Sequence, residues 1–254
     1  MTLLLERDAE SGFVDVVTPN VDHVVRINRN PQTYAALYEK AWLCVNDSRV
    51  LSLLARLRGL SLSTVPGADL AVALLEDARL PRDARICMVG GDDSLAADLR
   101  ARFGLADLTR IDAPMGLARK PAAIAEIAES VAAGRYRLVF LCVGSPQQEM
   151  IAAAVKARGG ATGVGLCVGA ALEFAVGRKP RAPRIMQRLA LEWLFRLASE
   201  PTRLYRRYLI DGPRILGLFM RDAARPPLRF VATLDGPGAD APPQRAALGM
   251  APHG

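Results

Sequence analysis

Short apolar runs alternate with segments of helical period along most of this chain. The apolar runs, most of which are followed by Gly or Asn, predict five strands, over residues 13–17, 42–45, 86–89, 138–143 and 164–168. The segments between them predict six helices, over residues 31–40, 48–58, 69–78, 94–103, 121–132 and 147–157. This alternation predicts an α/β fold with a mainly parallel sheet and helices on both faces. Ligands of such folds bind at the carboxyl ends of the strands.

Beyond residue 177 the pattern changes from α/β alternation to amphipathic helix. Between residues 183 and 197 one face is apolar and an adjacent face is charged, which predicts a helix docked on the core. The apolar face carries residues spaced by four, namely Ile185, Leu189, Trp193 and Leu197. Further arginines alternate with Leu, Tyr and Phe as far as residue 219, a composition typical of surface-seeking segments.

These patterns predict three regions. Residues 1–177 form the α/β core, and residues 178–225 form a basic amphipathic extension, which we call the appendage. Residues 226–254 are rich in Pro, Gly and Ala and are expected to be a disordered tail.

Charge is concentrated in the appendage. The 254-residue chain has a net charge of +7, whereas residues 178–225 alone carry twelve Arg or Lys and four acids, a balance of +8. The rest of the chain is therefore close to neutral. A localised basic patch indicates a specific anionic partner, such as phosphates, lipid head groups or nucleic acid.

Several other classes of protein are disfavoured. No window reaches 18 consecutive apolar residues, and the N-terminal segment lacks the pattern of a signal peptide. We therefore expect a cytoplasmic protein that touches a membrane only at its surface. Four cysteines lie far apart in apolar runs, which favours small buried side chains over a zinc site or disulfides: Cys44, Cys87, Cys142 and Cys167.

Polar residues follow the first two predicted strands. Thr18 and Asn20 come after the first, where either could cap a helix or direct backbone N–H groups at an anion or a sugar hydroxyl. His23 is expected to be a packed or capping side chain and not a base. Asp47 ends the second strand, where a carboxylate could accept a proton from an attacking hydroxyl. By local sequence alone Asp47 could equally cap the helix that begins at Ser48.

Two glycine-containing turns follow later strands. Gly90-Gly91-Asp92-Asp93 has neither dinucleotide-binding nor P-loop spacing, and its acids disfavour phosphate, so we interpret it as a turn and helix cap. In Gly144-Ser145-Pro146-Gln147-Gln148-Glu149, Gly144 permits close approach of a substrate, and the side chains of Gln148 and Glu149 suit sugar recognition. A capping box is the structural alternative for Glu149.

Taken in order, these motifs resemble the WecG/TagA/CpsF family of bacterial glycosyltransferases over about residues 13–210. The resemblance rests on T-x-N, a strand-end Asp, P-x-Q-E, R-A-P, L-E-W-L-x-R-L and E-P-x-R-x-x-x-R-Y. These are, in this chain, Thr18 and Asn20, Asp47, Pro146 to Glu149, Arg181 to Pro183, Leu191 to Leu197 and Glu200 to Tyr208.

The resemblance implies a Rossmann-like core and an inverting glycosyltransferase. It implies transfer of a hexosyl or N-acetylhexosaminyl group from a UDP-sugar to a polyprenyl-diphosphate-linked saccharide. The product would belong to a cell-surface polysaccharide such as exopolysaccharide, capsule or a teichoic-acid-like polymer. It also implies an appendage that completes the site at the inner face of the plasma membrane, and no cofactor or strictly required metal. The oligomeric state stays open, with a homo-oligomer possible.

On this interpretation Asp47 is the general base, and Thr18, placed with it among the catalytic residues, helps to orient the sugars. Asn20, Gly144, Gln148 and Glu149 bind the sugars, while Arg203, Arg206 and Arg207 stabilise the departing UDP. Two other function classes remain: an idle nucleotide-sugar-binding relative, and a nucleic-acid-binding module, which we disfavour because no nucleic-acid motif is present.

Three positions depart from the family pattern. Ser48 replaces a glycine after the strand-end Asp, and Thr64 stands where an arginine is common. Leu172-Glu173-Phe174 replaces F-D-F. The first two departures could narrow the pocket and remove one anionic contact.

Overall fold

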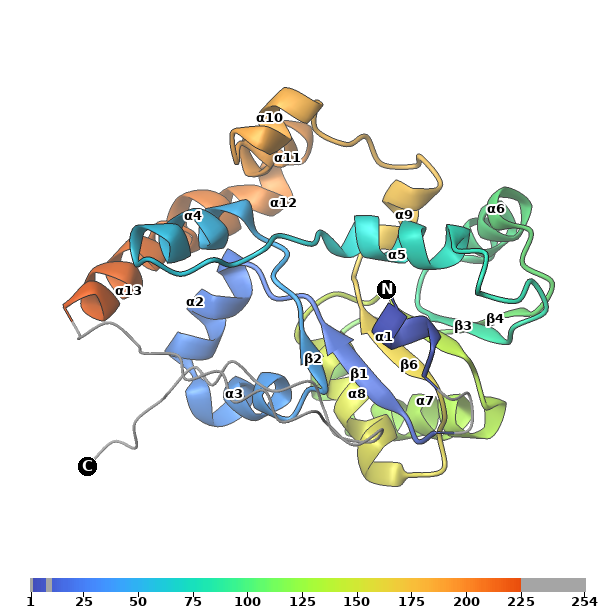
Figure 1. Ribbon diagram of the computed structural model, residues 1–254. Coiled ribbons are helices and arrows are strands. Elements are labelled where there is room, and N and C mark those ends of the chain that lie inside the picture. The colour runs from blue at the N-terminus through green and yellow to red at the C-terminus, as the bar shows by residue number, and fades with distance from the viewer. Residues whose placement is uncertain (1, 8–10, 225–254) are drawn as a thin grey trace.

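The computed structural model describes residues 2–7 and 11–224, so the predicted tail, 226–254, lies outside the described residues. Its centre is a six-stranded, all-parallel sheet of order β2-β1-β6-β5-β3-β4 (Figure 1). The strands are β1 (Val14–Val17), β2 (Leu43–Cys44), β3 (Ile86–Val89), β4 (Leu108–Ile111), β5 (Leu138–Leu141) and β6 (Val164–Cys167). The predicted parallel α/β fold is thus confirmed.

One strand, β4, is not predicted by the apolar pattern of the sequence. It pairs only with β3, at the edge of the sheet, and only its first residue is buried. Its two middle residues, Thr109 and Arg110, are polar and interrupt the apolar run, which an edge strand tolerates because it is not covered on every side. The predicted strands that match β3, β5 and β6 are instead buried at every position, which made them easy to recognise.

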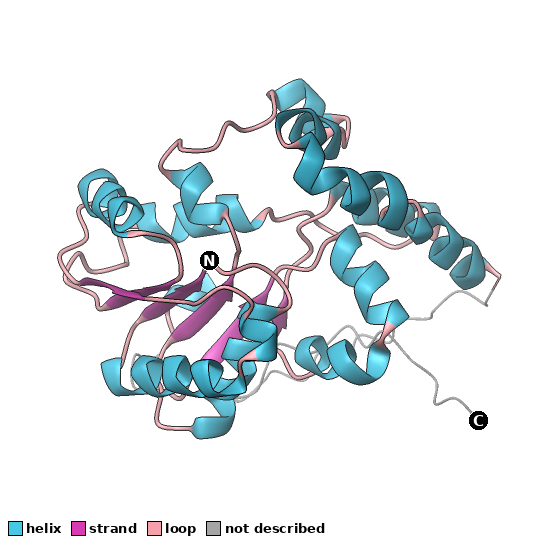
Figure 2. Ribbon diagram, turned by 180° about the vertical axis from the view of Figure 1, so that it is seen from behind, coloured by secondary structure: helices cyan, strands magenta, loops and turns pink. Residues whose placement is uncertain are grey.

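Helices cover both faces of the sheet (Figures 1 and 2). On one face lie α1 (Thr2–Leu5), α5 (Gly67–Glu76), α6 (Asp93–Phe103) and α9 (Ala171–Ala175). On the other lie η1 (Leu117–Arg119), α7 (Pro121–Gly134) and α8 (Gln147–Arg158). Consecutive strand residues alternate between the two cores: Met88 packs with the first group of helices and Cys87 with the second. This period of two follows from strand geometry.

A crevice at the carboxyl ends of β1 and β6 follows from the strand order. From β1 the chain continues to β2 on one side, whereas β6 lies on the other side of β1. Loops that leave adjacent strands in opposite directions open a crevice where ligands bind. The ends of β1 and β6 are joined by Thr18, whose buried hydroxyl donates a 2.8 Å hydrogen bond to the carbonyl of Cys167.

The appendage runs past the open side of this crevice. It contains α10 (Arg184–Arg188), α11 (Glu192–Ser199), α12 (Pro201–Tyr205), the π-helix η2 (Arg206–Asp211) and α13 (Arg214–Ala223). Figure 1 shows these helices against α2 (Val21–Arg29) and α4 (Arg49–Leu57), with α3 (Pro31–Glu39) beyond α2. Ion pairs of Arg29 with Asp211 (2.8 Å) and Arg58 with Asp222 (3.4 Å) link the appendage to the core. No helix within the described ranges is both long enough and apolar enough to cross a bilayer.

The single helix predicted over residues 183–197 is wrong. The chain breaks at Ala190, whose φ is +59°, and thus forms α10 and α11. As a result Ile185 and Leu189 are 67% and 63% exposed, although their spacing predicted a buried face. Backbone bonds that end α10, from Ala190 to Gln187 and from Leu191 to Met186, stabilise the break. Periodicity identified the helical residues but gave no sign of a left-handed residue between them.

The cysteines also differ in part from expectation. All four are free thiols, and Cys87 and Cys167 are buried in the sheet, as predicted for these two. Cys142 is partly buried, whereas Cys44 is exposed because β2 lies at the other edge of the sheet.

Candidate active site

The turn after β2 presents Asp47 at the crevice while its neighbours fix the backbone. Ser48 is the N-cap of α4, since its hydroxyl accepts a hydrogen bond from the N–H of Leu51 (3.3 Å). Asn46 is buried and donates to the carbonyls of Ser48 (3.1 Å) and Ser63 (3.2 Å). The helix therefore does not need Asp47 as a cap. One carboxylate oxygen of Asp47 accepts a 3.0 Å bond from the N–H of Gly67, at the start of α5.

The environment of Asp47 favours its protonated form. Burial raises the pKa of Asp47 from 3.8 to about 6, and Glu192 acts in the same direction. The bond from Gly67 and the charge of Arg196 oppose this rise without cancelling it. A carboxylate with a pKa near 6 is still largely ionised at pH 7 and is a stronger base than an ordinary aspartate.

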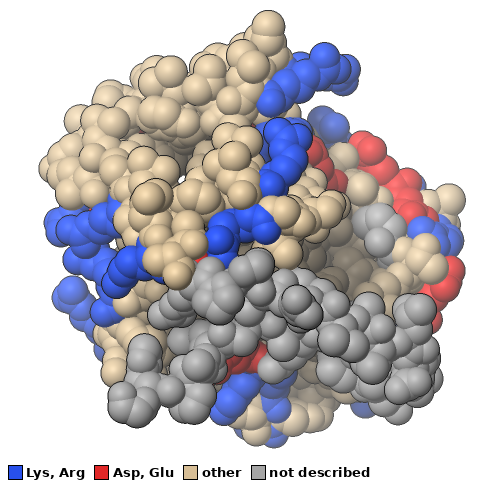
Figure 3. Space-filling model, turned by 60° about the vertical axis from the view of Figure 1, so that its left-hand side comes forward, with Lys and Arg blue, Asp and Glu red and all other residues tan. Residues whose placement is uncertain are grey.

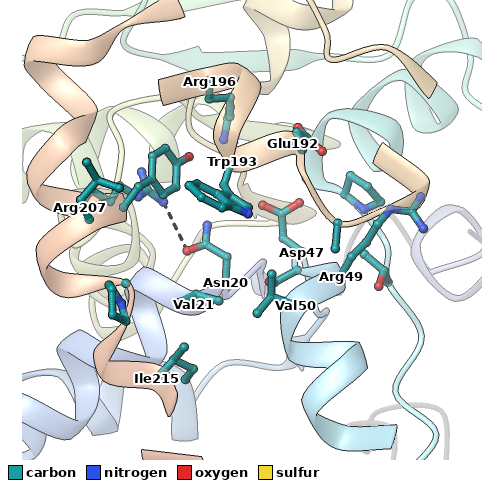
Figure 4. Close-up of a pocket in the computed structure, with 18 of the residues that line it drawn as sticks. Asn20, Val21, Asp47, Arg49, Val50, Glu192, Trp193, Arg196, Arg207 and Ile215 are labelled. Carbon is teal, nitrogen blue, oxygen red and sulfur yellow. Dashed lines mark hydrogen bonds between the residues drawn. The ribbon is translucent and has the colours of Figure 1, made fainter. Parts of the chain in front are cut away.

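A cavity of about 410 Å³ opens beside Asp47, between the core and the appendage. We call it the Asp47 cavity. Its polar and charged lining includes Asn20, Arg49, Glu192, Arg196 and Arg207, and its apolar lining includes Val21, Val50, Trp193, Ile215 and Leu216. Figure 4 shows side chains from α2, α4, α11 and α13 around one space, with the Asp47 carboxylate facing into it.

A second, smaller cavity of about 50 Å³ lies on the other side of Asp47. It is formed by the starts of α5 and α9 together with the segment before α10. Asp47, Glu192 and Arg196 line both cavities, and Arg181 and Phe174 line only the smaller one. Arg196 is held in place by stacking over the ring of Phe174, at 5.0 Å from the centroid. Asp47 therefore stands at the junction of two spaces, each of which has an arginine.

Asn20 joins the first loop to the appendage. Its side-chain oxygen accepts from the N–H of Asp22 (3.1 Å) and from Arg207 (3.3 Å), the bond drawn in Figure 4. His23 completes a capping box by accepting from the N–H of Asn20 (2.9 Å). Burial, with help from Arg207 and Arg26, lowers the pKa of His23 to about 3. His23 is therefore a neutral helix cap, as expected from the sequence.

Of the three arginines predicted to stabilise UDP, only one lies at the site. Arg207 lines the Asp47 cavity, whereas Arg203 and Arg206 do not. Arg203 is paired with Glu200, and Arg206 is 72% exposed and 4.0 Å from Asp211. Arg196, which falls on the charged face predicted between residues 183 and 197, lies at the site instead. Its place in the L-E-W-L-x-R-L motif is the signal that could have identified it.

The remaining predicted residues lie behind the two cavities and line neither. Thr18 supports the site from beneath, because its hydroxyl lies 3.3 Å from where a Cβ on Gly67 would stand. Gln148 and Glu149 are buried; Gln148 donates to Glu149 (2.8 Å) and accepts from the N–H of Gly169 (2.9 Å). Burial raises the pKa of Glu149, and one of its carboxylate oxygens has no hydrogen-bond partner. Gly144 has a left-handed φ of +74° in the loop before α8.

Two of the departures from the family pattern are accommodated locally. Ser48 caps α4, and Thr64 exchanges a 2.6 Å hydrogen bond with Ser52 while lining the Asp47 cavity. Glu173 forms a 2.7 Å ion pair with Lys179 and lines neither cavity. In the Gly90 turn, Asp92 accepts from the N–H of Leu95 (2.7 Å), so the predicted turn and cap is confirmed.

Within residues 2–7 and 11–224, no three His, Cys, Asp or Glu side chains come together in a group able to hold a metal ion. The charged groups at the junction are instead two carboxylates and several arginines. Such an arrangement can accept a proton at Asp47 and stabilise negative charge nearby.

Comparison with known families agrees with this chemistry. The model of the glycosyl transferase WecG/TagA/CpsF family matches residues 2–229, which include the whole α/β core and the described appendage. The match thus covers most of the chain and every residue that forms the two cavities. Members act as glycosyltransferases in the biosynthesis of cell-surface polysaccharides, with a nucleotide-sugar donor and a lipid-linked acceptor in general. The chain belongs to the WecG/TagA/CpsF family of glycosyltransferases.

Proposed function

We propose that this protein is an inverting glycosyltransferase that moves a hexosyl or N-acetylhexosaminyl group from a UDP-sugar to a polyprenyl-diphosphate-linked saccharide. The observation that carries the proposal is the position of Asp47, a partly buried carboxylate of raised pKa at the junction of two cavities. Because Asp47 borders both cavities, an acceptor hydroxyl and the anomeric carbon of a donor bound in the larger one can meet beside the base.

In the proposed reaction, Asp47 takes the proton from the acceptor hydroxyl. At the same time the oxygen of that hydroxyl attacks the anomeric carbon of the donor from the side opposite UDP. The new glycosidic bond forms as the bond to the β-phosphate oxygen breaks, and UDP leaves with the electron pair. The configuration at the anomeric carbon is therefore inverted. General-base catalysis of this kind contributes about 10²–10⁴-fold to the rate.

The negative charge on departing UDP requires stabilisation, for which we propose Arg196 and Arg207. Both line the Asp47 cavity, and Arg196 also reaches the smaller one. Fixed cations at the leaving group stabilise the transition state because they require no reorganisation. On this basis transfer should continue at an undiminished rate in excess EDTA. If activity disappeared and returned with Mg²⁺ or Mn²⁺, the arginines would not be sufficient.

The Asp47 cavity has an apolar side toward the appendage, which suits a protein that works beside lipid. Ile215 and Leu216 of α13 line it, and Leu216 is 56% exposed at its rim. We propose accordingly that the protein works at the cytoplasmic surface of the membrane, where such acceptors are anchored.

A direct test is to mix purified protein with each of a panel of UDP-sugars and lipid-linked saccharides extracted from the host. Release of UDP, with mass spectrometry of an acceptor heavier by one sugar residue, is the expected result for one donor. Donor binding without UDP release under all combinations would identify an idle nucleotide-sugar-binding relative instead.

A further inference from the structure

A groove next to the Asp47 cavity carries three arginines and no acid. It has a volume of about 620 Å³ and lies between α4, the segment 59–64 and α10. Arg49, Arg56 and Arg188 line it, together with the hydroxyl-bearing Ser52, Ser61 and Thr64 and several leucines. We call it the arginine groove. None of its lining residues is Asp or Glu.

We propose that the arginine groove binds the diphosphate of the lipid-linked acceptor. The inference rests on the proposed function for the identity of the lipid, and it adds to that function a specific diphosphate subsite. Arginine is suited to this ligand because its planar guanidinium donates paired hydrogen bonds to phosphate oxygens.

The charges of these arginines are not neutralised by the protein. Within the described part of the chain, Arg49, Arg56 and Arg188 have no ion pair with any Asp or Glu. Other arginines nearby contrast with them: Arg58, two residues after Arg56, pairs with Asp222, and Arg181 pairs with Asp69. Figure 3 shows that Arg and Lys side chains on this side of the molecule form separate groups and not one continuous field. An external anion is therefore the natural partner of this group.

The geometry of α4 directs two of the arginines to one ligand. Arg49, Ser52, Leu53 and Arg56 stand at positions i, i+3, i+4 and i+7, which share one face of a helix. The two arginines are separated by about 10 Å along the axis, a distance that their long side chains can close around a diphosphate. Arg188 approaches from α10 on the other side.

The groove lies next to the Asp47 cavity and shares part of its wall. Arg49, Thr64 and Ala190 line both, and Ala190 is the left-handed residue that separates α10 from α11. A diphosphate in the groove would leave its attached saccharide at the entrance to the Asp47 cavity. Arg49 and Arg188 supply positive charge beside Thr64, where the two spaces meet.

The outer rim of the groove is apolar, which distinguishes a lipid diphosphate from a free nucleotide. Leu53, Leu62 and Leu189 line it and are 45%, 43% and 63% exposed. Leu57 and Ile185, each 67% exposed, lie on the same two helices. A prenyl chain can extend over these side chains while its diphosphate stays among the arginines.

The test measures binding of farnesyl diphosphate, a short prenyl diphosphate that has no sugar and so cannot react. Titration of the full chain is compared with Arg56→Gln, Arg188→Gln and the control Arg119→Gln, an exposed arginine of η1. We expect each groove variant to weaken farnesyl diphosphate binding by about 10-fold or more, and the control to bind like the wild type. Affinity for UDP should stay within about twofold, since neither Arg56 nor Arg188 lines the Asp47 cavity.

Each other outcome has a defined meaning. Unchanged farnesyl diphosphate binding in both groove variants would overturn the proposal, even if the protein proves to be a transferase. Arginine-dependent binding in a protein that transfers no sugar would support the subsite and reject the proposed function. Inorganic pyrophosphate that binds as tightly as farnesyl diphosphate would overturn the lipid assignment. The lipid assignment would also be overturned if phosphatidylglycerol vesicles bound through the same arginines and farnesyl diphosphate did not bind.

Discussion

At the scale of single residues, the three residues of the turn Asn46-Asp47-Ser48 have different roles in the site. Asn46 and Ser48 satisfy the backbone of the turn and of α4. The Asp47 carboxylate is therefore left with one backbone bond, from Gly67, and with a largely buried position. Partial desolvation with few hydrogen bonds is how proteins raise the pKa of a carboxylate toward neutrality.

The pH dependence of transfer should report this pKa. Because a general base must be ionised, kcat/KM should rise with pH through a pKa of about 6 and then level off. Asp47→Asn should lower kcat by about 10²–10⁴-fold at pH 7.5, because the amide accepts no proton, while UDP binding stays intact. Asp93→Asn, at the exposed start of α6, is the matched control. A folded Asp47→Asn protein with normal turnover would remove Asp47 from the mechanism.

The same raised pKa has a consequence for stability. The pKa of Asp47 is about 6 in the folded protein against 3.8 unfolded, so ionisation favours the unfolded chain. The stability contributed by Asp47 is complete below the unfolded pKa and is lost as pH rises through about 6. Asp47→Asn should therefore raise the free energy of unfolding at pH 7.5 by up to about 3 kcal/mol, but have little effect near pH 4. Urea denaturation at the two pH values measures this difference; equal effects at both would contradict the burial of the charge.

The arginines show where residue-level prediction stops. The sequence places Asp47 at a strand end, and the parallel sheet brings that end to the crevice. No local pattern shows which appendage arginines face it. Arg207 lines the cavity and Arg203 does not, although both belong to one motif, because the direction of each side chain depends on how α12 and η2 dock on α2. Tertiary contacts, which a single sequence does not display, decide this.

At the scale of elements, the strands that are buried at every position could be predicted from their uninterrupted apolar runs. Strand β4 could not, because polar residues interrupt its apolar run. The break at Ala190 was missed for a related reason. Apolar spacing reports on burial, and the residues on both sides of the break keep helical spacing although Ile185 and Leu189 are exposed.

The backbone just before β6 packs closely against the backbone just before β5. Gly163 has a φ of +79°, and a Cβ there would lie 2.1 Å from the carbonyl oxygen of Tyr136. Gly163→Ala should therefore reduce the free energy of unfolding by about 3 kcal/mol or more, because backbone must move. Gly160→Ala is the control: φ is +75° but the space is open, so only the conformational cost of about 1 kcal/mol applies. Denaturant titrations of the two variants should differ clearly; similar losses would mean that the β5–β6 connection adapts easily.

At the scale of the whole molecule, fewer positive charges of the appendage are free to bind a ligand or a membrane than its sequence suggests. Arg178 pairs with Asp98 (2.7 Å), Lys179 with Glu173, and Arg181 with Asp69. These contacts fasten the segment before α10 to α5, α6 and α9, so part of the charge of +8 secures the appendage over the site. A membrane surface would therefore meet fewer free cations than the sequence count indicates, and apolar side chains should contribute more of the binding.

Membrane association should accordingly depend on exposed apolar residues near the C-terminal end of the appendage. Ile210 and Met220 are 49% and 65% exposed and line neither cavity at Asp47. Replacing both with Ser should reduce co-sedimentation with anionic vesicles by about 10-fold, since each contributes apolar area to the interface. Met115→Ser is a strict control, because Met115 is 90% exposed in the loop after β4, away from the appendage.

Salt and truncation separate the two contributions to this binding. Raising the ionic strength should weaken binding of wild type and double variant alike, because it screens the remaining arginines and leaves the apolar contacts. Removing residues 226–254 should preserve both vesicle binding and sugar transfer if the appendage is the binding surface. If the Ile210→Ser/Met220→Ser protein bound vesicles as well as the wild type, the membrane contact would lie elsewhere in the chain. The same conclusion would follow if removing residues 226–254 abolished vesicle binding.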